Sequence, residues 1–413
     1  MEYLSALSYQ RFLEKVTAHE PVEGVEAVPL SPEALGRVCS SDVRSPVDVP
    51  HFRRAMRDGF AVRARDTFGA EETTPKPFQL LEQVAAGDVP TATVGEGQCS
   101  YVATGAAVPE GADAVVMVEY SEERGGRVWL SQAVTPGQWV VPVGKDVAAG
   151  SVVVEAGTVL TPAKLGALAA TGHREVEVFR KPRVATFSTG NEILEPGEEL
   201  VPGKVYDVNS TTLAALLVQA GAEVRHFGRL PDDAGPLERT LRRAVAEFDL
   251  VVASGGTSKG KEDLMPGVLR NAPEVTELLH GARMKPGKPV LYARWARGDR
   301  DVPVVVLPGY PTSAAVTCLF LVDPLVRKLA RKPPRTYQKT TAVLSERVYS
   351  EAGRQEFKAV FLSEREDGTV MAKPVPKGSE SITTLASASG LFVVEPGRTI
   401  VEEGTRVEVL LLP

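Results

Sequence analysis

The sequence predicts a multidomain chain that combines α+β and α/β architecture: a three-layer α/β domain, a discontinuous helical domain, an inserted β domain and a C-terminal β-barrel. Three observations predict this fold class. Strand-like apolar runs alternate with helical periods over residues 181–331, which is typical of α/β domains. Short strands separated by Gly/Pro turns fill residues 26–144, and further strands without a long helix fill residues 332–413. A length of 413 residues accommodates several domains.

The beginning of the chain is expected to form a discontinuous domain from residues 1–25 and 145–180. Apolar positions of helical period predict a helix over residues 4–18. A second helix is expected over 160–171, where Pro162 lies near the first turn and a glycine follows the last. We expect the two helices to pack together, with the mainly-β domain of residues 26–144 inserted between them.

The α/β domain is expected over residues 181–331. Its strands are predicted at 184–188, 223–230, 250–253, 278–282, 290–293 and 302–307. Its helices are predicted at 211–220, 236–248 and 312–330. Strands that alternate with helices predict a parallel sheet covered on both faces. Beyond a Lys-Pro-Pro linker, the strand runs at 341–344, 357–362, 370–375, 391–394 and 407–411 predict a small barrel or sandwich without a helix of any length.

A double glycine follows the buried strand expected at 250–253. Gly255 and Gly256 expose backbone N–H groups with no side chain in the way, and Ser258 and two lysines follow. Parallel sheets bind ligands at the carboxyl ends of their strands, so we predict a turn that handles phosphate. The segment also fits the beginning of a P-loop, but Glu262 stands where a Ser or Thr would hold magnesium. A nucleotide-hydrolysing P-loop and a purely structural turn are the alternatives.

Several carboxylates occur where the strands of the α/β domain end. They are Glu192, Asp232, Asp233 and Asp263. Because the ends of parallel strands share one edge, we expect these groups to face one cleft. Carboxylates mixed with glycines, hydroxyls and lysines suit a phosphorylated ligand and a hard divalent metal such as Mg²⁺. Solvated surface charge is the alternative.

Two further segments supply groups for the same cleft. The first carries the cations Arg283, Lys285 and Lys288. The second, residues 308–313, is a stiff turn with Pro308 and Pro311 that leads into a helix N-terminus with hydroxyls, among them Ser313. Outside the α/β domain, Asp58 lies in an Asp-Gly turn beside three arginines. These arginines are expected to keep its carboxylate charged, unless the turn is merely solvated.

Composition excludes other classes of protein. A net charge of −6 argues against broad nucleic-acid binding. Cys39, Cys99 and Cys318 are far apart and form neither a disulfide framework nor a zinc motif. The apolar run around Cys318 is too short to span a bilayer, and the N-terminus has no signal-peptide pattern. The expected location is the cytoplasm.

Several motifs together resemble the MoeA family of molybdopterin molybdenumtransferases, whose eukaryotic relatives include the gephyrin E domain. They are RDGFAVRARD (57–66), ATGAAVPEGADAVVMVE (103–119), FSTGNEI (187–193), YDVNS (206–210), PDD (231–233), SGGTSKGKED (254–263), MKPGKP (284–289) and LPGYPTSA (307–314). They span most of the chain in the family's order. The chain departs from the family at Arg57, at Tyr310 and in the tail at residues 377–390, which affects details of the pocket rather than the class.

The resemblance implies a homodimer of four-domain subunits and a pocket in the α/β domain that the partner subunit completes. It implies insertion of molybdate, as a substrate, into adenylylated molybdopterin with release of AMP, dependent on Mg²⁺, and an upstream molybdopterin adenylyltransferase as a partner. Carried over motif by motif, the functional residues are Asp58, Thr104, Glu192, Asp232, Asp263, Lys285, Lys288, Pro308, Pro311 and Ser379.

Each residue then has an expected role. Gly255, Gly256, Ser258 and the lysines would hold the phosphate and the oxoanion. Glu192, Asp232 and Asp263 would hold magnesium or position the attacking oxygen, while Asp58 and Thr104 would reach the pocket across the dimer. The resemblance leaves open a gephyrin-like binding scaffold and a paralogue that handles tungstate.

Overall fold

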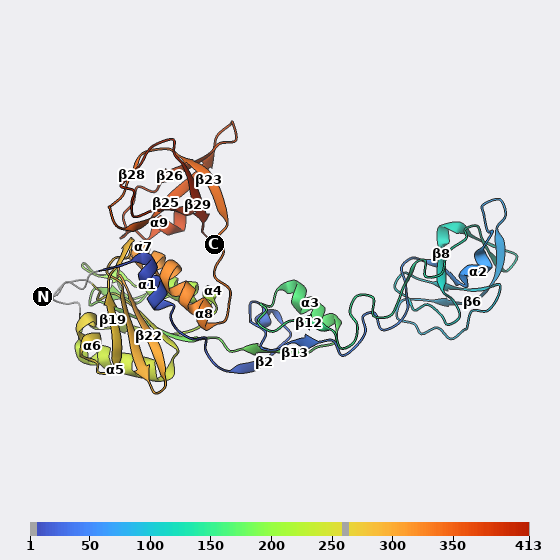
Figure 1. Cartoon of the computed structure of the whole chain (residues 1–413), viewed down its shortest axis with the longest axis horizontal. Helices are drawn as coiled ribbons and strands as arrows, with labels where there is room; N and C mark the ends of the chain where they lie inside the picture. The colour runs from blue at the N-terminus through green and yellow to red at the C-terminus, as the bar shows by residue number, and fades with distance from the viewer. Residues whose placement is uncertain (1–5, 258–263, 413) are drawn as a thin grey trace. The chain divides into compact units, whose positions relative to one another are not determined.

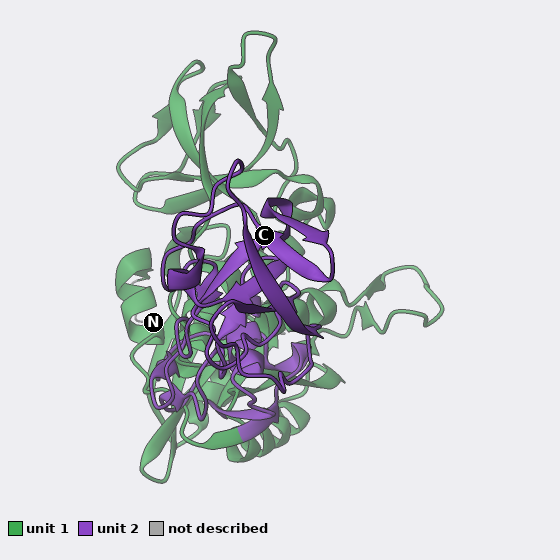
Figure 2. Ribbon diagram, turned by 90° about the vertical axis from the view of Figure 1, so that its right-hand side faces the viewer, with its two compact units in different colours: residues 1–26, 179–413 green, residues 27–178 purple. Residues whose placement is uncertain are grey.

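The computed structural model describes residues 6–257 and 264–412, so Ser258 and Asp263 of the predicted site lie outside the described residues. The chain divides into two compact units. Unit 2 is the continuous segment Ala27–Val178, and unit 1 comprises the chain before and after it (Figure 2). The four-domain boundaries expected above stay a prediction. Of the described helices, none combines the length and apolar character needed to cross a bilayer.

A six-stranded sheet forms the centre of the α/β domain, in the order β17-β14-β18-β22-β21-β19. These strands are β17 (Glu223–Leu230), β14 (Arg183–Thr189), β18 (Leu250–Ser254), β22 (Arg300–Leu307), β21 (Leu291–Arg297) and β19 (Val275–His280). The first four are parallel, whereas β21 and β19 are antiparallel to their neighbours. The expectation of a wholly parallel sheet is therefore wrong. Only two residues separate β21 from β22, and such a connection can join only antiparallel strands.

Helices cover both faces of this sheet and complete the three expected layers (Figure 1). The alternation of side chains along β18 shows how: Leu250 and Val252 point into one apolar cluster, and Val251 and Ala253 into the other. The first cluster includes α4 (Val208–Ala220), α7 (Pro311–Thr317), the π-helical turn η3 (Cys318–Val322) and α8 (Asp323–Leu329). The second includes α5 (Ala234–Glu247) and α6 (Met265–Asn271).

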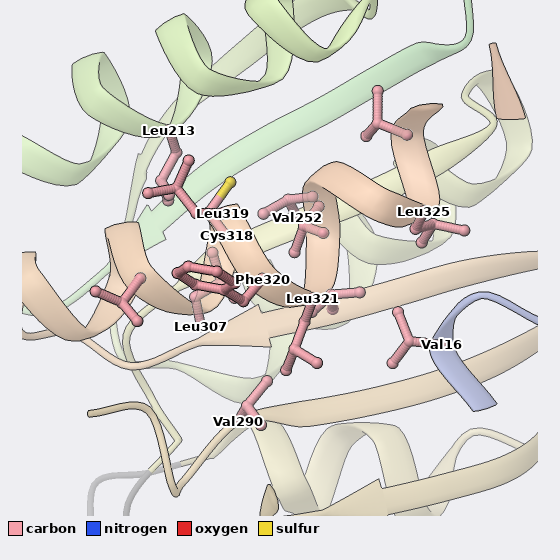
Figure 3. Packing of buried hydrophobic residues seen from close by; sticks show 14 of the residues in the cluster. Val16, Leu213, Val252, Val290, Leu307, Cys318, Leu319, Phe320, Leu321 and Leu325 are labelled. Carbon is pink, nitrogen blue, oxygen red and sulfur yellow. The ribbon is translucent and has the colours of Figure 1, made fainter. Parts of the chain in front are cut away.

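The first helix, α1 (Tyr9–Val16), belongs to the α/β domain. Its buried Phe12 and Val16 belong to the same apolar cluster as Leu213 and Phe320. Figure 3 shows Val16, Leu213 and Phe320 in this cluster. The helix of the later segment, α3 (Pro162–Ala170), instead packs with Cys39 and Val154 in unit 2. The expectation that these two helices pack together is therefore wrong. A helical period identifies the buried face of a helix but not the element that covers it.

Unit 2 contains the expected mainly-β segment, built around a six-stranded sheet in the order β8-β5-β7-β6-β10-β9. Its strands are β5 (Gly59–Val62), β6 (Lys76–Val84), β7 (Gln98–Val102), β8 (Ala114–Met117), β9 (Ser121–Arg124) and β10 (Arg127–Leu130). Shorter elements are η1 (Pro32–Ala34), β3 (Val43–Arg44), β4 (Arg54–Ala55), α2 (Ala64–Thr67), η2 (Val118–Tyr120), β11 (Val140–Val141) and β12 (Val152–Val154). The chain enters and leaves through the paired strands β2 (Val25–Pro29) and β13 (Glu175–Phe179).

The C-terminal domain is a closed five-stranded barrel, as expected. The barrel closes because β25 pairs with both β26 and β27. Its strands are β23 (Lys339–Leu344), β25 (Gln355–Glu364), β26 (Val370–Pro374), β27 (Gly390–Val394) and β29 (Arg406–Leu411). Smaller elements are β24 (Val348–Tyr349), β28 (Ile400–Val401) and the short helix α9 (Thr383–Ser387), which the sequence did not predict. In addition, β20 (Ala282–Lys285) pairs with both β25 and β1 (Leu7–Ser8).

Candidate functional site

A pocket of about 1100 Å³ lies where the parallel strands of the α/β domain end. Four successive strand ends contribute to it: Gly190 and Glu192 after β14, Asp232 after β17, Gly255 after β18 and Pro308 after β22. This is the edge at which open α/β sheets bind ligands. The volume lies just above the usual range of about 300–1,000 Å³ for small-molecule pockets, so the site can take a large ligand.

The double glycine allows the chain to turn tightly at the floor of this pocket. Gly255 and Gly256 both line it, with φ angles of +95° and +66°. A Cβ atom at Gly255 would collide with the backbone carbonyl of Thr189, and one at Gly256 would lie 3.1 Å from the Thr189 hydroxyl and from Met265 Cγ. Glycine suits both positions because it has no side chain to collide there. The Gly255 N–H donates to the Leu307 carbonyl at 3.0 Å.

Two of the four predicted acids share the pocket. Glu192 and Asp232 both line it. A reciprocal pair of hydrogen bonds holds Asp232: its Oδ2 accepts from the Asn191 N–H at 3.0 Å, and its own N–H donates to Asn191 Oδ1 at 3.3 Å. Lys204 also lines the pocket and donates to the Asn191 carbonyl. Within residues 6–257 and 264–412, no three His, Cys, Asp or Glu side chains lie close enough to hold a metal ion together.

Asp233 does not line the pocket, which corrects the expectation for this acid. Its Oδ1 accepts from the Gly235 N–H at 2.9 Å and caps α5. An aspartate one residue before a helix satisfies one of the free N–H groups of the first turn. Neighbouring acids at one strand end therefore have different roles.

The remaining predicted residues of unit 1 are only partly brought together. Pro308 and Pro311 line the pocket. Lys285 instead forms ion pairs with Glu351 and Glu356, at 3.5 and 3.7 Å. The other three are not lining residues: Ser313 is buried in α7, the Lys288 carbonyl accepts from Ala282 N–H, and the Ser379 carbonyl accepts from Thr312 N–H.

Asp58 and Thr104 lie together in unit 2. The Asp58 carboxylate accepts from the Thr104 N–H at 2.7 Å. Two of the three arginines expected to surround Asp58 make other contacts. Arg57 lies over the Trp139 ring, 5.2 Å from its centroid, and Arg53 donates to the Ala112 carbonyl. A backbone N–H group, rather than a guanidinium, therefore holds this carboxylate.

Sequence reasoning missed several polar residues of the pocket, among them Thr189, Asp207 and Asn209. Asp207 caps α4 by accepting from the Ser210 N–H at 2.9 Å. The Asn209 amide donates to Ser254 Oγ and to the Gly309 carbonyl, at 2.7 and 2.8 Å, and so connects α4 to two strand ends. A signal was present, because an Asp two residues before an Asn and an apolar helical run marks a helix start.

Comparison with known proteins finds the same family over the whole chain. Three family models match in succession: the MoeA N-terminal region (domain I and II) over residues 7–172, a probable molybdopterin binding domain over 185–328, and the MoeA C-terminal region (domain IV) over 341–412. These matches support a multidomain chain in which an N-terminal region, a molybdopterin-binding type of α/β domain and a C-terminal domain follow one another.

Similar proteins match over nearly their full length. Molybdopterin molybdenumtransferase 2 of Mycobacterium tuberculosis is 34% identical, and 98% of each chain is covered. Molybdopterin molybdenumtransferase of a Nostoc species is 32% identical, covering 92% of this chain and 87% of that one. The crystal structure of a molybdopterin biosynthesis MoeA protein from Pyrococcus is 36% identical, with a TM-score of 0.81 and 98% and 99% of the two chains covered. The chain therefore belongs to the MoeA family, the family of the molybdopterin molybdenumtransferases.

Proposed function

We propose that this protein inserts molybdate into adenylylated molybdopterin, releases AMP and so forms the molybdenum cofactor. The observation that carries the proposal is the pocket at the strand ends, where Glu192 and Asp232 share one cavity with the Gly255–Gly256 turn. Acids beside an open backbone turn suit a substrate with a phosphoanhydride. The names of the related proteins support the same reaction.

The residues of the pocket divide into holding and positioning groups. The backbone N–H group of Gly256 would donate to a phosphate oxygen, because no side chain of its own obstructs it, whereas the Gly255 N–H already donates to the Leu307 carbonyl at 3.0 Å. Pro308 and Pro311 would keep the last turn stiff against the ligand. We propose Lys285, Lys288, Ser313 and Ser379 as additional substrate contacts from the family resemblance alone.

The chemistry of the acids suits magnesium. Carboxylate oxygens are the protein ligands that Mg²⁺ prefers, and it commonly completes its shell with substrate phosphate and water. Glu192 and Asp232 would hold it from this cavity, and Asp263, the third expected ligand, lies outside the described residues. When bound, the ion neutralises charge on the phosphate groups. The chain's own acids would orient the substrate so that its phosphate meets the attacking oxygen.

We further propose a cytoplasmic homodimer that receives its substrate from a molybdopterin adenylyltransferase. The resemblance to the family supports the dimer, in which Asp58 and Thr104 of one subunit would complete the pocket of the other. The hydrogen bond between the two residues supports a shared role, because it fixes the Asp58 carboxylate relative to Thr104.

Reconstitution tests the proposed function directly. Purified protein is incubated with adenylylated molybdopterin, Mg²⁺ and molybdate, and AMP and active cofactor are measured. Release of AMP is expected to require both ions. AMP release that does not depend on molybdate would contradict the proposed reaction, and undiminished release in excess chelator would contradict the role of magnesium. Tungstate in place of molybdate tests the paralogue, and partner capture without turnover would favour the scaffold.

A further inference from the structure

Two polar atoms of the pocket are buried without a hydrogen-bond partner. They are Thr189 Oγ1 and Asp207 Oδ2. Both residues line the pocket, and their exposed fractions are only 3% and 4%. Buried polar atoms are normally paired, because an unpaired one loses its bond to water without replacement. Two such atoms in one cavity therefore point to a ligand that supplies the missing partners.

The surroundings of Asp207 determine what kind of partner is missing. Its Oδ1 accepts from the Ser210 N–H, and its own N–H donates to the Leu194 carbonyl at 2.8 Å, so the side chain is held in place. A carboxylate only accepts hydrogen bonds. Next to this residue the pocket consequently favours a group rich in N–H or O–H donors and disfavours a phosphate.

The mouth of the pocket has a different character. Large apolar or aromatic side chains line it and are also exposed: Leu200, Val205, Tyr206, Tyr310 and Ile382. Tyr310 and Ile382 are exposed by 61% and 59%. Such side chains offer contact area to the faces of a flat ring. A planar ligand with apolar faces and a donor-rich edge fits both features.

We propose that Thr189 and Asp207 form the subsite for the pterin ring, with Asp207 Oδ2 accepting from the edge that carries the amino group and the adjacent ring N–H. The assignment rests on the proposed function and gives the substrate an orientation. The pterin lies towards the start of α4, and the phosphate lies at the Gly255–Gly256 turn. The ribose of the adenylate also offers two neighbouring donors, so the experiment must distinguish the two sources.

Binding of small probes to the intact protein tests the subsite. A methylpterin is titrated, alongside the methyllumazine in which a carbonyl replaces the amino group, and AMP. Asp207→Asn keeps an acceptor for the cap of α4 but places an amide where the carboxylate oxygen lay. We expect this variant to bind the methylpterin roughly 10- to 100-fold more weakly, the range for a hydrogen bond to a charged group. We expect the wild-type protein to bind the methyllumazine as weakly as the Asp207→Asn variant binds the methylpterin. The affinity for AMP should be the same in the variant as in wild type.

The matched control is Asp233→Asn, since Asp233 also caps a helix but does not line the pocket. It should bind the pterin like wild type. Thr189→Val is a second test that does not alter the helix cap, and it should weaken pterin binding but not AMP binding. Three results would each overturn the proposal. They are no saturable binding of the methylpterin to wild type, unchanged methylpterin binding in both Asp207→Asn and Thr189→Val, or weaker binding of AMP rather than of the methylpterin in these two variants. Molybdate-dependent AMP release by wild type, measured in parallel, tells failure of the subsite apart from failure of the proposed function.

Discussion

At the scale of single residues, the backbone at Gly255 connects sequence to site most directly. Its left-handed φ of +95° is accessible to glycine, and the Thr189 carbonyl occupies the space of a side chain. Glycine is therefore required at position 255 by the geometry of the backbone.

Gly255→Ala should consequently affect both stability and binding. We expect a loss of roughly 1–3 kcal/mol in the free energy of unfolding, because the backbone is strained and the Thr189 carbonyl must move. Substrate binding should weaken as well. The control is Gly267→Ala, at a helical position where an added Cβ meets nothing within 4 Å. Chemical denaturation of both variants measures the effect, and equal stability of the two would contradict it.

His19 gives a pH dependence at the same scale. Its Nε2 is 2.7 Å from the Tyr292 hydroxyl, and burial, together with the nearby Arg294, lowers the pKa of His19 from 6.5 to about 4. The unfolded chain therefore binds a proton at a higher pH than the folded chain does. Stability from neutral His19 is present above pH 6.5 and is lost as the pH falls towards 4.

His19→Gln should remove this dependence while retaining a polar partner for Tyr292. The stability difference between wild type and variant is expected to shrink as the pH falls from 6.5 to 4 and to level off below. Its slope should not exceed about 1.4 kcal/mol per pH unit, the limit for one proton. Denaturation at several pH values measures it, and a difference that stays constant over this window would refute the assignment.

At the scale of elements, the segment after α8 is more ordered than its Lys-Pro-Pro sequence indicates. The buried carboxylate of Asp323, at the beginning of α8, accepts from Arg327 Nε at 2.9 Å and from Arg335 Nε at 3.0 Å. Arg335 belongs to the chain that leads into the barrel, and Lys332 N–H also donates to the Arg327 carbonyl. These bonds from Asp323 and Arg327 of α8 therefore hold the connection to the barrel in place.

Asp323→Ala should destabilise unit 1 strongly. It leaves two largely buried guanidinium groups, exposed by 15% and 11%, without their carboxylate. Removal of one partner from a buried ionic cluster costs about 3 kcal/mol or more. The matched control is Glu408→Ala, which breaks an exposed pair with Lys339 and should change stability by less than about 1 kcal/mol. Thermal unfolding compares them, and similar losses would show that burial does not decide the effect.

Patterns within single elements predicted much of the fold. Apolar runs located the buried strand β18 and its double glycine, and proline and glycine marked the ends of α3. The predictions of the fold that were wrong concerned contacts between distant segments of the chain. The antiparallel direction of β21 depends on the short turn that connects it to β22. The helix α1 packs where it does because Phe12 meets distant side chains such as Tyr292, and the local periodicity of the sequence does not reveal such contacts.

The same limit applies to the site. Motifs predicted that Glu192, Asp232 and the glycine turn share an edge, because strand ends in a parallel sheet must do so. Position at a strand end did not by itself separate Asp232 from Asp233, since both follow the same strand and only the start of α5 decides which one caps a helix. Nor did the motifs predict that Lys285 pairs with barrel acids.

At the scale of the whole molecule, the residues that the family resemblance suggests come from both compact units. Glu192 and Asp232 belong to unit 1, whereas Asp58 and Thr104 belong to unit 2. In the proposed homodimer, each pocket would combine unit 1 of one subunit with unit 2 of the other. A subunit with a defective unit 1 could then still supply an intact unit 2 to the pocket of its partner. Mixed dimers test this property of the assembly.

Asp58→Asn and Asp232→Asn should each reduce the rate of AMP release on the order of 100-fold as pure dimers. Co-expressed with separate affinity tags and purified as mixed dimers, they should regain activity, because one of the two pockets then contains both wild-type residues. Mixed dimers of Asp232→Asn with itself, prepared with the same tags, are the control. Mixed dimers that stay inactive would exclude a pocket shared between subunits.

The central claim is that the acids lining the pocket, in contact with adenylylated molybdopterin, drive molybdate insertion. Single-turnover AMP release, with and without molybdate, tests it most directly in wild type, Asp232→Asn and the helix-cap variant Asp233→Asn. We predict molybdate-dependent release in wild type and Asp233→Asn, and a rate reduced on the order of 100-fold in folded Asp232→Asn. A folded Asp232→Asn protein that releases AMP at the wild-type rate would contradict the claim.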